Sequence, residues 1–245
     1  MELLQRIYEC PNVQLCLDSK ITKHHCKAIV MCQQATLEEF HLPEPWSGDL
    51  KNAPILFLSS NPSIAKKEKY PVSSWTNEQK VDFFINRFNK SRPWVKNGLF
   101  PLMQDGTYKD KWVRFWAALK KRSQELLGEA NIRSGIDYAI TEVVHCKSKA
   151  EIGVKEALNE CVHRYLKNVL EESGAKVVVC LGSQVSSVIQ ETYNIPANSK
   201  IHGPVPISKG TRYFAFLPHP NARAERSFAK RMPEELKILK EHLMN

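Results

Sequence analysis

Short apolar runs, each bounded by polar or turn-forming residues, recur along the chain and predict its strands. The best of these runs are residues 55–59, 138–143, 177–181 and 213–217. They are rich in β-branched and aromatic side chains, which favour strands. Because the runs are almost continuously apolar rather than alternating, they indicate strands that are buried on both faces, as in a parallel sheet.

Between these runs, apolar side chains recur at the spacing of a helix. One stripe consists of Trp112, Phe115, Trp116 and Leu119, and Gly128 ends it. The pattern predicts helices over residues 111–127, 153–173 and 183–191, and a last helix that begins at Pro233. Strands that alternate with helices predict an α/β fold: a three-layer α/β/α sandwich around a central, mostly parallel four-stranded sheet.

The length and composition are those of a globular protein. The chain has 245 residues, of which 42% are hydrophobic and 25% charged, as in ordinary soluble domains. We expect one domain over residues 1–245, with an N-terminal arm (1–50), a core (51–245) and a long active-site insertion at about 60–110. The sequence shows no membrane span and no signal peptide, so we expect a cytoplasmic protein without a membrane partner, acting as a monomer.

The charge of the chain favours a polyanionic partner. The formal net charge is +9, and excess positive charge of this kind attracts polyanions. Residues 209–231 contain Glu225 as their one acid, against six basic residues: Lys209, Arg212, Arg223, Arg226, Lys230 and Arg231. This basic segment surrounds a turn formed by His219 and Pro220.

Two predicted strands end in polar, proline-containing turns, which suggests one shared site. Residues 55–59 lead into a turn that contains Asn61, and residues 213–217 lead into His219. Ligands of open α/β sheets bind at the carboxyl ends of the strands. An Asn amide can hold a water molecule, and a neutral imidazole can donate a hydrogen bond to developing negative charge. Taken singly, each residue also fits an ordinary surface turn.

Four segments of the chain, which follow the order of the family's motifs, resemble those of the iron–sulfur uracil-DNA glycosylases. Residues 140–148 read Ile-Thr-Glu-Val-Val-His-Cys-Lys-Ser, similar to the family's I-T-N-V-V-K-C-R-P, and residues 177–182 are similar to its v-i-v-x-L-G. The turn Ser59-Ser60-Asn61-Pro62-Ser63 looks like its G-x-N-P-G motif. The segment His219-Pro220-Asn221-Ala222-Arg223 looks like its H-P-S/A-x-L/R motif. The resemblance covers roughly residues 50–245.

The resemblance implies a DNA glycosylase of base-excision repair, which flips a base out of DNA and hydrolyses its N-glycosidic bond. Asn61 would orient the attacking water, and His219 would stabilise negative charge on O2 of the leaving base. The base would be contacted by Ser59, Ser60, Pro62, Trp94 and Glu142. DNA would be contacted by Asn221, Arg223 and Arg226, with Arg223 filling the vacated stack.

Two residues depart from the family pattern. Ser59 stands where the first motif has Gly, and Glu142 stands where many members have an Asn that reads O4 and N3 of uracil. An ionised Glu repels O4, whereas a protonated one does not, so the excised base is uracil by default or another deaminated base. Trp94, in Arg92-Pro93-Trp94-Val95, matches the family's R-P-F-V; Phe100 and Trp75 are the alternatives for the stacking aromatic.

The seven cysteines point to a metal centre or to simple burial, because the chain lacks a secretion signal. The resemblance implies a structural [4Fe–4S] cluster held by Cys10, Cys16, Cys146 and Cys161. Cys26 and Cys32 repeat the spacing of the first pair and are the alternative ligands. Zinc is the alternative metal, because His24, His25 and His145 are close in sequence. Cys180 is assigned to the core, where a free thiol packs as a small hydrophobe.

Two other classes of protein remain open. One is a DNA-binding module of the same fold without turnover, which the Glu142 substitution keeps possible. The other is a hydrolase of free nucleosides or nucleotides. The basic segment argues against that hydrolase, because a small nucleoside needs no extended cationic surface, whereas DNA binding does.

Overall fold

The central sheet joins segments from the whole chain. The structure is a computed structural model that describes residues 2–65, 67–208 and 210–245. Within those residues the main sheet has five strands, in the order β4-β1-β5-β7-β6. Their bounds are β1 Ile55–Ser59, β4 Tyr138–Glu142, β5 Val177–Leu181, β6 Ile201–Ile207 and β7 Gly210–Leu217. Strands β4, β1, β5 and β7 are parallel to one another, which confirms the predicted α/β class and mostly parallel sheet.

The fifth strand, β6, is the one that the pattern of apolar residues does not predict. It pairs antiparallel with β7 at the sheet edge, and its register shifts between His202 and Val205. Its sequence contains Pro204 and Pro206, which cannot donate ladder hydrogen bonds and are confined in sheets to edges and irregular positions. The expected four strands therefore become five.

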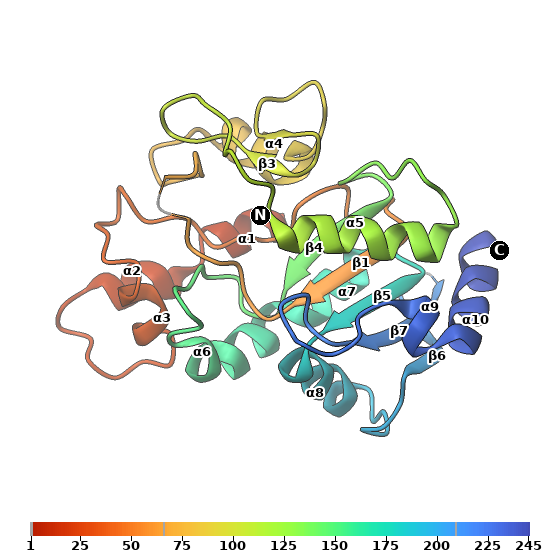
Figure 1. The fold of residues 1–245 in the computed structure, drawn as a ribbon. Helices are drawn as coiled ribbons and strands as arrows, with labels where there is room; N and C mark the ends of the chain where they lie inside the picture. Colours follow the sequence, from red (N-terminus) through yellow and green to blue (C-terminus); the bar gives the residue numbers. More distant parts are fainter. Residues whose placement is uncertain (1, 66, 209) are drawn as a thin grey trace.

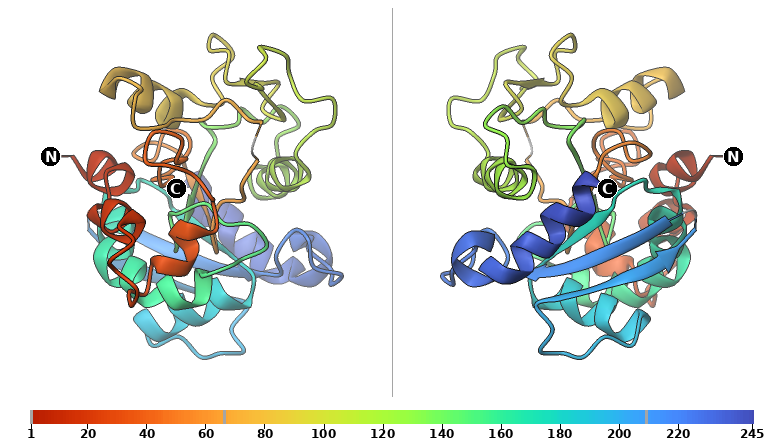
Figure 2. Two further views of the ribbon diagram at one scale, coloured as in Figure 1. Left: turned by 90° about the vertical axis from the view of Figure 1, so that its left-hand side faces the viewer. Right: turned by 90° about the vertical axis from the view of Figure 1, so that its right-hand side faces the viewer.

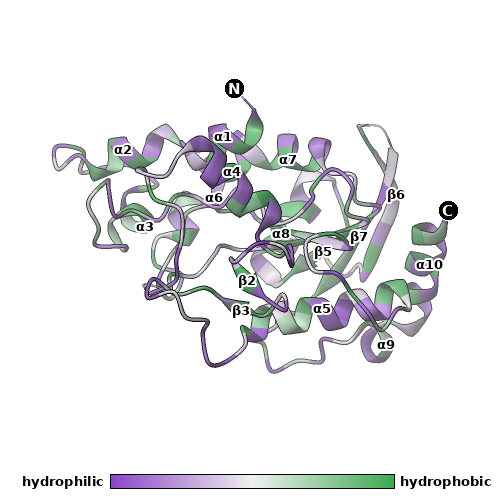
Figure 3. Cartoon of the chain, turned by 90° about the horizontal axis from the view of Figure 1, so that it is seen from above, coloured by the Kyte–Doolittle hydropathy of each residue, from purple (hydrophilic) through white to green (hydrophobic). Residues whose placement is uncertain are grey.

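The strands divide their side chains between two cores, one on each face of the sheet. Leu56 and Leu58 of β1 belong to one buried cluster, whereas Ile55 and Phe57 belong to the other. This alternation follows from the two-residue period of a strand. In Figure 3, β5 is coloured as hydrophobic, whereas α5 shows both colours. Burial on both faces explains why β1, β4 and β5 are apolar almost throughout.

Helices cover both faces of this sheet, as Figures 1 and 2 show. The face of Phe57 is covered by α5 (Arg114–Leu127), α9 (Phe228–Arg231) and α10 (Pro233–Met244). The face of Leu56 is covered by α6 (Val154–Cys161), the π-turn η1 (Val162–Leu166), α7 (Lys167–Glu172) and α8 (Ser183–Thr192). The three-layer arrangement is thus confirmed.

The N-terminal segment packs on the Leu56 face. Its helices are α1 (Leu3–Tyr8), α2 (Pro11–Leu17) and α3 (Lys27–Met31), and they share the buried cluster of Leu56. The hydroxyl of Tyr165 donates to the carbonyl of Arg6 at 3.2 Å. The backbones of Ser47 and Ile140 exchange two hydrogen bonds, of 2.8 and 3.0 Å, which place the segment beside β4.

Residues 60–110 contain more regular structure than their sequence pattern suggests. They form α4 (Asn77–Asn86) and a small hairpin of β2 (Val95–Lys96) and β3 (Phe100–Pro101). Thr76 and Gln79 begin α4 with a reciprocal capping box. The aromatic residues of this segment obscure its helical period because they pack on one another, as Phe83 does on Trp75 and Trp94. No helix of the described ranges is long and apolar enough to span a membrane.

Candidate active site

A cavity of about 360 Å³ lies at the carboxyl ends of β1 and β4. It is lined by the turn after β1, by Glu142 at the end of β4, by the loop around Lys147, by the start of α5 and by His219 after β7. A second cavity, of about 580 Å³, contains none of the predicted catalytic residues. The smaller cavity is therefore the candidate site, because it joins three distant segments where ligands of α/β sheets bind.

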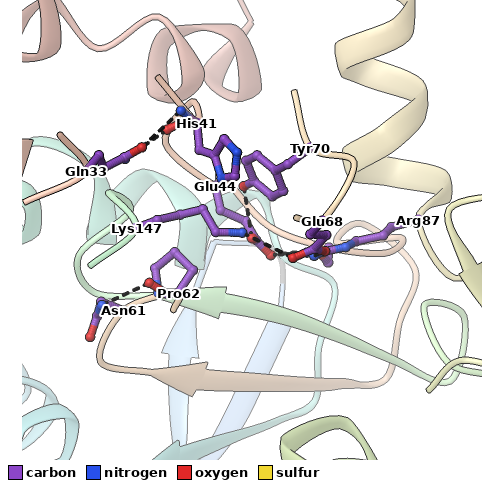
Figure 4. A network of polar contacts seen from close by, with 10 residues as sticks. Gln33, His41, Glu44, Asn61, Pro62, Glu68, Tyr70, Arg87 and Lys147 are labelled. Atoms are coloured by element: carbon purple, nitrogen blue, oxygen red, sulfur yellow. Dashed lines mark hydrogen bonds and ion pairs between the residues drawn. The ribbon is translucent and has the colours of Figure 1, made fainter. Parts of the chain in front are cut away.

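The turn after β1 holds Asn61 in place through the neighbouring loop. The backbone N–H groups of Val144 and Ser148 donate to the carbonyls of Ser60 and Pro62, at 2.9 and 3.0 Å. The Asn61 amide Nδ2 donates to the carbonyl of Pro62 at 3.0 Å, as Figure 4 shows. This bond leaves Oδ1 as the acceptor end of the amide, to which the Ser60 hydroxyl lies at 3.4 Å. Asn61 can therefore accept a hydrogen bond from a water molecule in the cavity.

His219 is held as a neutral hydrogen-bond donor. The backbone N–H of Asn221 donates to its Nδ1 at 3.2 Å, so the ring proton is on Nε2. Burial lowers the pKa of His219, and Glu151 opposes this shift only in part. The ring stacks on Phe115, with centroids 5.7 Å apart. Gly182 lies against the Cβ of His219 with a φ of +92°, a conformation that favours glycine. The geometry suits donation to a developing oxyanion.

Glu142 is a buried carboxyl group with one free oxygen. Its side chain is only 5% exposed, and Oε2 has no hydrogen-bond partner among the described residues. Burial raises the pKa of Glu142 well above its usual value, and the carboxylate of Glu44 raises it further; Arg87 and Lys147 oppose the shift. The raised pKa favours the protonated form of Glu142, which can donate a hydrogen bond from its free oxygen.

A network of buried charges supports this side of the cavity (Figure 4). Arg87 bridges two carboxylates, with Glu44 at 2.7 Å and Glu68 at 2.6 Å. The Lys147 Nζ lies 3.7 Å from Glu68 and 3.5 Å from the ring centroid of Tyr70. The two negative charges of Glu44 and Glu68 are thus balanced by the two positive charges of Arg87 and Lys147. An ionised Glu142 would add an unmatched negative charge, which low-dielectric surroundings disfavour.

Tyr70 ties this network to the insertion. Its hydroxyl donates to Glu44 Oε2 at 3.0 Å, so Tyr70→Phe removes one bond to a buried carboxylate and keeps the ring under Lys147. We expect the free energy of unfolding to fall by about 1.5–3 kcal/mol in urea denaturation. Tyr108→Phe is the matched control, because Lys96 also lies over that ring. Equal effects of the two substitutions would contradict the stabilising role of the Tyr70 hydroxyl.

The structure does not bring Trp94 to the cavity. Its ring packs against Trp75 and Phe83, each with centroids 5.4 Å away, and its Nε1 donates to Asp82 at 3.0 Å. Trp75 also lies outside the cavity. The aromatic rings that line the cavity, apart from His219, are Phe115 and Trp116. The R-P-W-V segment therefore forms part of an aromatic cluster in the insertion.

The loop after His219 carries the three predicted DNA-contacting residues at the surface. Asn221 lines the cavity, whereas Arg223 and Arg226 lie outside its lining, and all three are exposed. The end of the loop is held by α5, because Glu125 accepts from the hydroxyl of Ser227 at 2.6 Å and from the N–H of Phe228 at 3.0 Å. The guanidinium of Arg226 donates to the carbonyl of Pro220, which closes the loop on itself.

Five buried thiols gather between the N-terminal helices and the β4–α6 region. Burial raises the pKa of Cys146, and the thiols of Cys161, Cys10, Cys26 and Cys16 raise it further. The pKa of Cys161 is raised to about 12 by burial, with contributions from Cys26 and Cys10. No group of three or more His, Cys, Asp or Glu side chains in the described part of the chain is arranged to hold a metal ion.

Apart from Glu142, sequence reasoning missed the buried charged side chains of the cavity, namely Glu44, Glu68, Arg87 and Lys147. Lys147 carried a signal, because it follows Cys146 inside a motif that resembles the glycosylase pattern. The other three come from the N-terminal segment and the insertion, where no pattern marks them. Only the fold shows that they meet.

The mostly parallel sheet, with a turn-borne Asn and a strand-end His around one cavity, defines an α/β protein whose cavity lies at the carboxyl ends of strands, where α/β sheets bind ligands. The family model of the uracil DNA glycosylase superfamily matches residues 45–242. The chain therefore belongs to the uracil DNA glycosylase superfamily, whose members are DNA glycosylases. A search of the curated proteins found no match.

Proposed function

We propose that this protein is a DNA glycosylase that hydrolyses the N-glycosidic bond of a flipped, deaminated base, with uracil as the first candidate. The observation that carries the proposal is the single cavity that joins Asn61, Glu142 and His219 in a member of this superfamily. The exposed basic residues of the loop after His219 support DNA as the substrate, because cations on a surface bind phosphates.

The proposed reaction assigns one task to each of the three residues. Asn61 Oδ1 accepts a hydrogen bond from a water molecule and directs its oxygen at C1′ of the deoxyribose. The bond between C1′ and the base breaks, and its electron pair leaves with the base. His219 Nε2–H donates to O2 of the base, which carries the developing negative charge. The water leaves a hydroxyl on C1′, and the proton that it releases is balanced by the proton that the departing base anion takes up from solvent, so the products are an abasic site and the neutral free base.

Glu142 favours an oxo base over an amino base. Its protonated carboxyl can donate from the free Oε2 to an exocyclic oxygen such as O4 of uracil. An exocyclic amino group at that place presents a hydrogen towards the same proton, which disfavours cytosine and adenine. Phe115 takes the stacking role that the sequence motif suggested for Trp94, because it lines the cavity beside His219.

The test of the proposed function is a cleavage assay on labelled oligonucleotides that each carry one uracil, hypoxanthine, xanthine or cytosine. Alkali then converts abasic sites to strand breaks. We expect breaks at one or more oxo bases, none at cytosine, and loss of cleavage in Asn61→Ala. Protein that is folded and binds DNA but releases no base would support the binding module without turnover instead.

We also propose that the gathered thiols hold a structural [4Fe–4S] cluster through Cys10, Cys26, Cys146 and Cys161, so that Cys26 replaces the Cys16 of the sequence expectation. The thiols of Cys10 and Cys26 both raise the pKa values of Cys146 and Cys161, whereas the Sγ of Cys16 already has a partner in Nδ1 of His24, at 3.3 Å. Four buried cysteines suit an iron–sulfur cluster, which binds thiolates and offsets their mutual repulsion. The cluster would tie the N-terminal helices to α6 and take no part in base release.

Cys26→Ala is expected to remove nearly all iron from protein purified without oxygen, because each ligand of the cluster supplies one thiolate. Iron and sulfide analysis and the visible spectrum measure the loss. Cys180→Ala is the matched control. Cys180 is also buried, and burial raises its pKa without a contribution from another thiol. Cys16→Ala should retain iron. Full iron content in Cys26→Ala, or none in the unchanged protein, would contradict the proposed ligand set.

A further inference from the structure

An exposed tryptophan stands beside the mouth of the cavity. Trp112 is 59% exposed, and among the described residues it is the only aromatic in the set of large hydrophobic side chains that remain exposed. A buried tryptophan removes a large apolar area from water, which stabilises the fold. Trp112 does not contribute this stabilisation. Single exposed apolar residues are common, so the position of Trp112 and its neighbours must decide what it does.

The position of Trp112 is fixed by residues that belong to the cavity. Val113, the next residue, lines the cavity and donates its N–H to the carbonyl of Leu99 at 2.9 Å. Phe115, three residues on, stacks on His219. Consecutive Cα atoms are about 3.8 Å apart, so Trp112 stands at the rim. The helix α5 begins only at Arg114, so Trp112 is not part of the buried helical stripe that its spacing predicted.

Exposed cationic residues flank Trp112 along the chain. Lys109, Lys111 and Arg114 are exposed, and Asp110 is the one acid in this stretch of six residues. Lys109 also lines the cavity. An aromatic ring among cations is the composition that binds the strand of a nucleic acid: the ring stacks on a base, and the cations contact the phosphates on either side.

We propose that residues 109–114 form a strand-binding rim, in which Trp112 stacks on a base next to the flipped nucleotide in the same strand. The inference rests on the proposed function, because it takes DNA as the ligand. The flipped base enters the cavity beside Val113, and its neighbours are joined to it through one phosphodiester each. The same strand must therefore pass over the rim where Trp112 is exposed, while Lys109, Lys111 and Arg114 contact its phosphates.

Binding to single-stranded and duplex oligonucleotides that contain one uracil tests this rim, with every variant made in Asn61→Ala to prevent turnover. Trp112→Ala is expected to raise Kd for both forms by about 5- to 150-fold, the range for loss of one base stack. Trp112→Phe should retain most of the affinity and lose the share of the tryptophan fluorescence quenching that Trp112 is expected to contribute on binding. Ile136→Ala is the control, because Ile136 is also exposed but precedes β4, at the opposite end of that strand from the cavity.

The outcomes separate this inference from the proposed function. Unchanged affinity in a folded Trp112→Ala protein would overturn the contact and leave the glycosylase proposal standing. A loss confined to duplex DNA would also overturn it, because it would place Trp112 on the opposite strand. If the protein with Trp112 intact bound neither form, the proposed function and the rim would fail together.

Discussion

His219→Ala is expected to lower the rate constant of base release by about 10²–10³-fold, the usual effect of removing one donor to a developing oxyanion. The affinity for DNA should change little, because His219 acts on charge that forms only as the base leaves. Single-turnover cleavage of a uracil oligonucleotide measures the rate constant, and titration of the same oligonucleotide measures Kd. His163→Ala replaces an exposed histidine on η1 and should change neither quantity.

The pH dependence of the reaction provides a second check on His219. Its pKa is lowered by burial from the ordinary value near 6.5, and the neutral form already carries the Nε2 proton. The contribution of neutral His219 should therefore persist as pH falls through 6.5 and be lost only below that value. A rate that still rises as pH falls through 6.5 in Glu142→Gln would contradict the role of neutral His219, because it would require the imidazolium form.

The second large effect concerns Glu142, whose protonated form is proposed to read the base. Its pKa is raised well above 4.5, so the active neutral form is favoured below the raised pKa and is lost as pH rises through it. Above that pKa the rate should fall about tenfold per pH unit, in proportion to the neutral fraction of Glu142. Two pH units above the pKa, the rate should be roughly 100-fold lower than at its maximum.

Glu142→Gln separates the proton from the shape of the side chain. The amide of Gln donates at every pH, so this variant should keep activity near neutral pH and lose the alkaline decline. Single-turnover rates between pH 6 and 10 on the uracil oligonucleotide measure both effects, and Glu142→Ala should be slow throughout. An alkaline decline that persists unchanged in Glu142→Gln would show that another group titrates, and would remove Glu142 from base recognition.

The sequence predicted most of the sheet and little of the insertion. Strands β1 and β5 begin and end where their apolar runs do, because a strand buried on both faces needs an unbroken apolar run. Strand β6 has one exposed edge, so its prolines and Gly203 are tolerated there. These residues are rare in strands, so the sequence pattern does not predict β6. The sequence pattern does not predict the helix α4 for a different reason: its aromatic residues pack on one another within the insertion and not in one stripe against the sheet.

The residues of the candidate site also differ in how well the sequence predicts them. Asn61 and His219 were predictable because they follow strands, and the carboxyl ends of parallel strands meet at one edge of a sheet. Trp94 shows the limit. The tryptophan matches a motif but packs outside the cavity. Spacing along the chain does not determine which side chains converge when the connecting segments are irregular.

By itself, the sequence determined the α/β class, the order of the main elements and the strand ends that carry Asn61 and His219, because hydrophobic periodicity and strand polarity are local properties of the chain. Only the tertiary structure decided the ionisation of Glu142 and the exposure of Trp112. The first depends on burial and on the charges of Glu44, Arg87 and Lys147, which come from three separate segments. The second depends on where α5 begins against the cavity. Both are properties of surroundings that exist only once distant segments have packed together.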